Sequence, residues 1–188
     1  MVTIRNETNR DVEAREQLLD SVWGPSRFEK TAELLREGRS PAAGLSLVAE
    51  QDGKLVGTVR LWHVCAGPGR PALLLGPLAV DEAWRNRGIG GALVRRAVGV
   101  AARRGHNALL LVGDAAYYQR FGFSAAKTGA IWLPGPFERQ RLLGCELRAG
   151  ALDGMRGLIS ATGRSAQKPS FTTPDANPVA NPASRRAA

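Results

Sequence analysis

Five residues near the middle of the chain have the types and spacing of a phosphate-binding turn. They follow an apolar run ending in Leu78-Ala79-Val80 and lead into a helix expected to run to about Arg104. A strand, a glycine-rich turn and a helix in this order gather backbone N–H groups at the positive end of a helix dipole, where phosphate binds. Glycine matters here because a Cβ would keep a phosphate away from the backbone. These residues are Arg85, Arg87, Gly88, Gly90 and Gly91.

Two common phosphate motifs are excluded for this turn. A P-loop ends in Gly-Lys-Ser/Thr, and the chain has no lysine between Lys54 and Lys127. The dinucleotide fingerprint needs a third glycine where Leu93 stands. What remains is Arg85-x-x-Gly88-x-Gly90 after a buried strand. We therefore expect residues 73–105 to bind the diphosphate of a cofactor.

With this turn, and with Tyr118-Gln119-Arg120-Phe121-Gly122-Phe123 further along, the sequence resembles the GCN5-related N-acetyltransferase (GNAT) superfamily. The acetyl-CoA signature of that family is Arg/Gln-x-x-Gly-x-Gly/Ala after a strand, and its second motif is Tyr-x-x-x-Gly-Phe. The stretch GDAAYYQRFGF is similar to a subgroup of predicted acetyltransferases whose substrates are mostly unassigned. The resemblance covers residues 1–150 and is clearest over 73–123.

The resemblance implies a role for each matching position. Backbone groups of the splayed central strand, at Leu78, Ala79 and Val80, would hold the pantetheine arm of acetyl-CoA. Tyr118 would protonate the departing thiolate, and Tyr117 is the second choice because it points about 100° away on a helix. No metal is expected. The diphosphate would lie against the turn formed by Arg85, Asn86, Arg87, Gly88, Ile89, Gly90 and Gly91.

The general base and the acceptor site are less sharply defined by the sequence. His63, Asp114 and Glu138 are candidate bases, and a water relay to a partly deprotonated amine would need none of them. The acceptor is expected to be a primary amine on a small molecule or a protein. We expect it between the first two helices, the loop 64–72 and the segment 131–138, with Trp62 and Trp132 either walling the site or packed in the core.

The function predicted is direct acetyl transfer from acetyl-CoA to this amine in a ternary complex. Neither Cys65 nor Cys145 adjoins the two motifs, so no covalent acetyl intermediate is expected. Two alternatives remain open: a non-catalytic acyl-CoA-binding sensor, and an acetyltransferase acting on RNA or an RNA-associated protein. The net charge of +9 favours the RNA reading, whereas the aromatic residues do not alternate with basic ones as a base-stacking surface requires.

Composition and cysteine content bound the class of protein. The 188 residues, 44% of them hydrophobic and 23% charged, suit one globular domain. No apolar stretch of ~18 residues predicts a membrane span, and the charged N-terminus lacks the apolar centre of a signal peptide. The two cysteines have no metal-binding or CxxC spacing. We expect a cytoplasmic monomer or homodimer with reduced thiols.

Hydrophobic periodicity predicts an α/β mixed sheet flanked by helices, in the order βααβββαβαββ. The helices are expected at about 8–23, 26–37, 89–104 and 114–120. The Asp52-Gly53 pair predicts a hairpin, and Gly76-Pro77 predicts a bulge in the central strand. Residues 1–150 would form the GNAT domain, residues 151–160 a C-terminal extension, and residues 161–188 a disordered tail rich in Ala, Pro, Asn and Ser.

Overall fold

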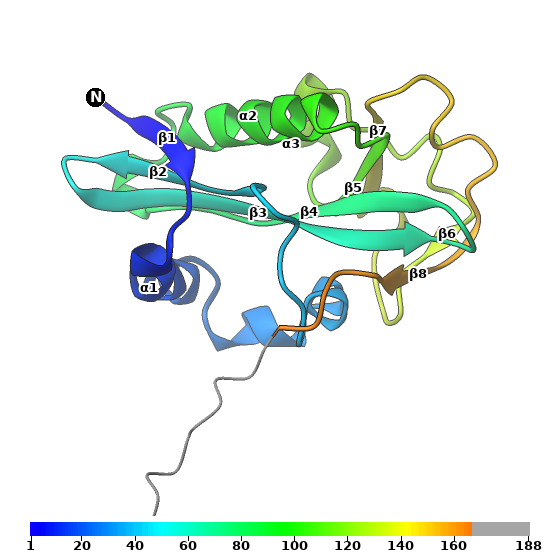
Figure 1. Ribbon diagram of the computed structural model, residues 1–188, viewed down its shortest axis with the longest axis horizontal. Helices are drawn as coiled ribbons and strands as arrows, with labels where there is room; N and C mark the ends of the chain where they lie inside the picture. The colour runs from blue at the N-terminus through cyan, green and yellow to red at the C-terminus, as the bar shows by residue number, and fades with distance from the viewer. Residues whose placement is uncertain (167–188) are drawn as a thin grey trace, which may run out of the picture.

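The computed structural model describes residues 1–166. These residues form one eight-stranded sheet with helices on both faces (Figure 1). The helices are α1 (Val12–Trp23), α2 (Ile89–Arg103) and the short α3 (Ala115–Tyr118). The strands are β1 (Thr3–Asn6), β2 (Ser46–Gln51), β3 (Lys54–Ala66), β4 (Pro71–Val80), β5 (Ala108–Val112), β6 (Ile131–Trp132), β7 (Leu142–Glu146) and β8 (Gly157–Ala161).

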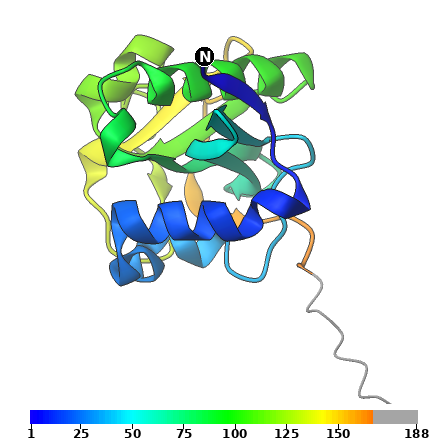
Figure 2. The same cartoon turned by 90° about the vertical axis from the view of Figure 1, so that its left-hand side faces the viewer.

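The strand order in the sheet is β1-β2-β3-β4-β5-β7, with β8 paired to both β3 and β6. Most neighbours are antiparallel, and β4 and β5 are parallel because α2 crosses over between them. Figure 2 shows α1 on one face of the sheet and α2 on the other. The predicted mixed α/β sheet is therefore confirmed.

The predicted hairpin and the predicted amphipathic helix are both confirmed. Asp52 and Gly53 both have positive φ, which suits the tight turn that joins β2 and β3. Helix α2 buries one stripe against the sheet and exposes its arginines on the other side. The residues of that buried stripe are Ile89, Leu93, Val94, Ala97 and Ala101.

The central strands separate where the bulge was predicted. Strand β4 pairs with β5 only at Leu73 and Leu74, whereas it pairs with β3 along nearly its whole length. The β3–β4 register shifts opposite Gly76-Pro77, so β4 carries one extra residue there. The indole of Trp62 donates a 2.6 Å hydrogen bond to the Gly76 carbonyl and supports the bulge from below. Trp62 is therefore a buried structural residue.

The second helix predicted over 26–37 does not form. Two short 3₁₀ turns, Pro25–Glu29 and Thr31–Leu35, take its place, and the extended Lys30 separates them. The tertiary contacts explain this outcome. Ala32 and Leu35 are buried while the Thr31 hydroxyl donates to the Pro136 carbonyl, and a continuous helix would have to give up this placement.

The sheet continues past residue 150, where the predicted extension and tail begin. Strand β8 pairs with β3 at residues 64–66. Beyond it, the Thr162 N–H donates to the His63 carbonyl at 3.0 Å and the Ala166 N–H to the Gly38 carbonyl at 2.8 Å. Disorder over 161–166 is therefore wrong, and the remainder of the predicted tail lies outside the described residues. Among the residues that are described, no helix is long and apolar enough to cross a membrane.

A buried ion-pair network ties α1 to the sheet. Glu7 accepts from Arg15 on α1 and, at 2.9 Å, from Nε of Arg60 on β3; the Glu7 and Arg15 side chains are 5% and 6% exposed. Glu7→Ala leaves two arginines without their shared carboxylate, so it should lower the free energy of unfolding by ~3–5 kcal/mol in urea denaturation. The exposed Glu13→Ala should change it by less than about 0.5 kcal/mol. Equal effects of the two variants would contradict the prediction.

Candidate active site

The predicted phosphate turn leads directly into α2. Gly88 is the N-cap of the helix with φ +79°, and Asn86 also has a positive φ of +61°. The first helical hydrogen bond runs from the Ala92 N–H to the Gly88 carbonyl. The N–H groups of Gly88, Ile89, Gly90 and Gly91 therefore have no partner within the helix. The structure thus brings the predicted amide donors together at one helix end.

The side chains around the turn point in two directions. Ile89 is buried in the core, so it can offer a ligand only its N–H. Arg85 is half exposed and lies 3.9 Å from Glu82. The Arg87 guanidinium lies 4.7 Å over the Trp84 ring. Both arginines are thus at the surface near the free amides, where they add positive potential for a diphosphate.

The predicted pantetheine-binding strand has one free edge. Ala79 packs under α1 against Leu18 and Leu19, whereas Leu78 and Val80 are half-buried on the α2 side. Strand β5 has already diverged at this point, so in the described part of the chain the β4 edge opposite β3 has no strand partner. Its backbone groups can pair with an extended ligand as a neighbouring strand would.

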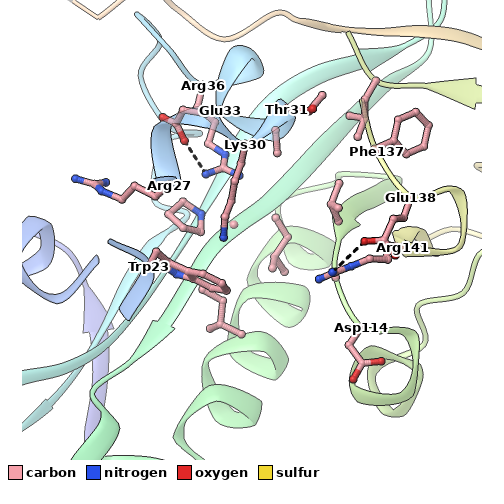
Figure 3. Close-up of a pocket in the computed structure, with 18 of the residues that line it drawn as sticks. Trp23, Arg27, Lys30, Thr31, Glu33, Arg36, Asp114, Phe137, Glu138 and Arg141 are labelled. Atoms are coloured by element: carbon pink, nitrogen blue, oxygen red, sulfur yellow. Dashed lines mark hydrogen bonds and ion pairs between the residues drawn. The ribbon is translucent and has the colours of Figure 1, made fainter. Parts of the chain in front are cut away.

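A cavity of about 710 Å³ lies beside this opening (Figure 3). Its floor is formed by residues 75–78 of β4 and residues 112–114 at the end of β5. One wall comes from residues 23–36 and the opposite wall from residues 133–141, and both tyrosines of the second motif line it. The structure thus brings Leu78 and Tyr118 to one cavity, although they are distant in sequence.

Two of the three segments predicted to wall the acceptor slot line this cavity. Residues 27–36 and 133–138 line the cavity, whereas the loop 64–72 does not. That loop shrinks to a turn at residues 67–70, because β3 and β4 extend to Ala66 and from Pro71. Neither Trp62 nor Trp132 contributes to the lining; Trp23 does.

Tyr118 lines the cavity, and its ring is closely packed. An ideal Cβ built on Gly113 would approach the Tyr118 ring to 2.4 Å, so the ring lies directly against the glycine backbone. Phe123 meets the same ring edge-on, with centroids 5.9 Å apart. Burial raises the pKa of Tyr118 to about 12, with a further contribution from Tyr117. The hydroxyl is therefore protonated at neutral pH and is able to donate a proton.

Tyr117 reaches a different place. Its hydroxyl lies 2.9 Å from where a Cβ on Gly90 would stand, so it contacts the first turn of α2. Burial raises the pKa of Tyr117, and Arg120 and Arg95 partly oppose this shift. The two tyrosines thus divide the site, with Tyr117 at the phosphate turn and Tyr118 against Gly113.

The three candidate bases are placed very differently. His63 does not line the cavity and lies beside His106, with ring centroids 5.6 Å apart. Asp114 and Glu138 do line it. One Asp114 oxygen accepts from the Ala116 N–H at 3.0 Å and caps α3, which leaves its second oxygen for other partners. Glu138 lies 3.5 Å from Arg141.

Gly113 is a site residue that the sequence analysis did not single out. Gly113→Ala must displace the Tyr118 ring, so we expect a loss of kcat of about tenfold or more if that hydroxyl acts in catalysis. The affinity for coenzyme A should change by less than about threefold, since the phosphate turn is untouched. Initial rates and calorimetric titration separate the two quantities. Unchanged kcat in the folded variant would contradict this placement.

The comparisons with known proteins agree with this architecture. The sequence model of an acetyltransferase (GNAT) domain matches residues 42–125. The uncharacterized N-acetyltransferase YhbS of Escherichia coli K12 is 29% identical over 157 residues, which is 83% of this chain and 93% of YhbS. The uncharacterized N-acetyltransferase YjhQ of the same strain is 33% identical over 117 residues, covering 58% of this chain and 64% of YjhQ.

Two solved structures are also similar. The Escherichia coli YhbS structure in complex with CoA superposes with a TM-score of 0.73 at 29% identity, covering 86% of this chain and 89% of that one. A GNAT family acetyltransferase from Brucella melitensis in complex with acetyl-CoA gives 0.58 at 28% identity, covering 76% and 94%. The fold is thus the fold of these two acetyltransferase structures. The sequence is similar to those of GNAT family acetyltransferases.

Proposed function

We propose that this protein is an N-acetyltransferase that transfers the acetyl group of acetyl-CoA to a primary amine in a ternary complex. The observation that carries the proposal is one continuous site. Tyr117 links the unpaired amides of α2 to the cavity, because its hydroxyl lies against Gly90 and it lines the cavity with Leu78 and Tyr118. The similar YhbS and Brucella structures hold CoA and acetyl-CoA respectively, which supports the same donor here.

The residues present suit coenzyme A. Four N–H groups without helical partners suit a diphosphate, and the absence of a Cβ at Gly90 lets the Tyr117 hydroxyl lie against this turn. The pantetheine arm contains amides, which match the free backbone edge at Leu78–Val80. The donor would therefore enter along β4 with its thioester near the bulge at Gly76.

In the proposed reaction, the protein stabilises the oxyanion, protonates the thiolate and accepts the proton of the amine. The nitrogen of the amine attacks the thioester carbonyl, so a C–N bond forms and the C–S bond breaks. Backbone N–H groups of β4 would stabilise the oxyanion, and Tyr118 would give its proton to the departing thiolate. The proton released by the amine would go to Asp114, to Glu138 or to water. No cysteine lines the cavity, which supports direct transfer.

We further propose a cytoplasmic location and a monomeric or homodimeric state. Both cysteines are free, which suits a reducing compartment.

The two alternative functions, an acyl-CoA-binding sensor and an RNA-directed acetyltransferase, predict different behaviour from an acetyltransferase of small or protein amines. A sensor would bind coenzyme A without turnover, and an RNA-directed enzyme would be retained on RNA in a strongly salt-dependent way through the exposed arginines of α2.

A thiol-release assay tests the proposal. Acetyl-CoA is mixed with the protein and a panel of amines, amino acids, polyamines and peptides, and free thiol is followed over time. We expect amine-dependent release and an N-acetylated product by mass spectrometry. Calorimetric titration with coenzyme A runs alongside. Tight coenzyme A binding with no release for any amine would favour the sensor, and no binding would remove the proposal.

A further inference from the structure

We propose that the acceptor amine carries an anionic group, a carboxylate or a phosphate, which binds between Lys30, Arg36 and Arg141 in the cavity. The inference rests on the proposed function, because it names the class of acceptor for the same site. It follows from the three cations that line the two walls, because Lys30 has no acidic partner within residues 1–166 and Arg36 uses only part of its guanidinium on Glu33. Figure 3 shows Lys30 and Arg141 extending from opposite walls into the space between them.

Arg36 is the central observation. Its side chain is only 11% exposed, and Nη1 donates to Glu33 at 3.0 Å. Nε is fully buried without a hydrogen-bond partner, and Nη2 donates no hydrogen bond to any group within residues 1–166. A guanidinium offers five N–H donors, so most of them are unused here. A buried cation with unused donors is costly unless a ligand completes its pairing.

The Nη2 end of the Arg36 guanidinium faces the part of β4 where the thioester is proposed to lie. Nη2 lies 3.8 Å from where a Cβ on Gly76 would stand, so it faces the bulge of β4. Leu78, where the proposed thioester arm begins its contact, is two residues further along the strand. An anion held by Arg36 would therefore lie close to the transferred acetyl group. It would belong to the acceptor, since the diphosphate binds at the start of α2.

Lys30 adds a second cation, and unlike Arg36 it has no counter-ion within residues 1–166. Its Nζ lies 3.5 Å from the centre of the Trp23 ring, and it forms no ion pair with any acid in the described part of the chain. Its pKa is lowered by burial first, and then by the charges of Arg36 and Arg141. The local potential is therefore positive, and a bound anion would relieve it.

The charged residues that line the cavity differ between its two ends. Arg27 is held by Glu16 at 2.5 Å and Asp20 at 2.8 Å, which excludes it from the anion subsite. Asp114 lies with the tyrosines, well away from Arg36 in Figure 3. Glu29, Glu33 and Glu138 are the other acids of the lining; Glu33 lies 3.0 Å from Arg36 and Glu138 lies 3.5 Å from Arg141. An ammonium near Asp114 and an anion near Arg36 and Lys30 would orient a zwitterionic acceptor.

The test compares acceptors that differ by one anionic group. Three pairs serve: alanine with alaninamide, 4-aminobutyrate with butylamine, and O-phosphoethanolamine with ethanolamine. In at least one pair the anionic member should have about tenfold higher kcat/KM, as expected for a charged hydrogen bond. A preference within the first two pairs identifies a carboxylate, and one confined to the third identifies a phosphate. Preference for the neutral member in all three pairs would overturn the proposal.

Substitutions of the lining cations test whether they cause the preference for anionic acceptors. Lys30→Gln and Arg36→Gln should each bring the preference for the anionic member close to one while the affinity for coenzyme A is unchanged. Lys127→Gln is the matched control, because Lys127 is paired with Glu146 and Asp153 and lies outside the cavity. It should leave the preference intact. If Arg36→Gln fails to fold, Lys30→Gln decides alone, and an unchanged preference in that variant would overturn the proposal.

A binding measurement separates this inference from the proposed function. Calorimetry measures the affinity of each acceptor for the protein saturated with coenzyme A, where no transfer is possible. Suppose that anionic acceptors bind more tightly in this titration but release no thiol in the separate assay with acetyl-CoA. That result would contradict the enzymatic function and support the subsite. Thiol release with tighter binding of neutral acceptors would support the function and overturn the subsite.

Discussion

Replacing Tyr118 by phenylalanine should lower kcat by about 100-fold or more, because a general acid contributes ~10²–10⁴-fold to such a reaction. The ring would stay in place against Gly113 and Phe123, so only the hydroxyl is lost. The affinity for coenzyme A should change by less than about threefold. Burial keeps the pKa of Tyr118 near 12, so the wild-type hydroxyl stays protonated below about pH 11. Steady-state rates from pH 6 to 10 measure the effect.

Tyr117→Phe is the matched control for this prediction. It removes the same hydroxyl from the adjacent ring, whose oxygen lies at Gly90 at the start of α2. We expect a change mainly in the affinity for coenzyme A and less than about a tenfold loss of kcat. A larger loss of kcat in Tyr117→Phe than in Tyr118→Phe would transfer the role of acid to Tyr117. Unchanged rates in both variants would leave the thiolate to be protonated by water.

Replacing Gly90 by leucine should weaken coenzyme A binding by more than about 100-fold. The added Cβ would stand 2.9 Å from the Tyr117 hydroxyl and 3.6 Å from Val80, so the leucine would displace Tyr117 and crowd the amides that the diphosphate is proposed to use. A lost set of charged hydrogen bonds at ~1.5–3 kcal/mol each accounts for this magnitude. Calorimetric titration of the folded variant with coenzyme A measures it.

Gly99→Leu controls for the effect of a larger side chain on the same helix. A Cβ at Gly99 would meet only the flexible end of Arg103, at 3.4 Å. The helix should gain slightly in stability, by less than about 1 kcal/mol, because leucine is a better helix former than glycine. Coenzyme A affinity should be unchanged in this variant. Normal affinity in Gly90→Leu would instead remove the diphosphate from this turn.

The parts of the fold that were predictable are set by short stretches of sequence. The hairpin depends on Asp52-Gly53, and α2 on a repeated apolar spacing that begins right after the glycines. The bulge follows from a proline in an otherwise apolar strand. Each of these signals acts over a few residues, so no knowledge of the rest of the chain is needed to interpret it.

The parts that were missed depend on distant partners. Strand β8 has only Ile159 fully buried, while Leu158 is exposed, so it lacks the apolar alternation of a strand and forms because β3 offers an edge. The helix expected over 26–37 is replaced because Thr31 reaches Pro136 across the cavity. In both cases tertiary packing overrides the local secondary-structure propensity.

The same division applies to the candidate site. The phosphate turn and the tyrosine motif are each a single short stretch of sequence, so both could be predicted. The variants described above test their roles. The charged lining of the acceptor cavity was not predicted. Lys30 and Arg36 look like solvated residues in a polar segment, and only the fold brings them opposite Arg141. No spacing along the chain indicates that arrangement.

The hydrogen bond from the Trp62 indole to the Gly76 carbonyl has a consequence for how a ligand aligns along β4. That carbonyl already accepts one hydrogen bond from the protein, so it would be a weaker acceptor for the amides of an incoming extended molecule than a carbonyl without a partner. In the proposed binding mode, Trp62 would therefore favour donor amides that pair beyond the bulge. Its indole would in this way help to set where the thioester lies relative to Tyr118.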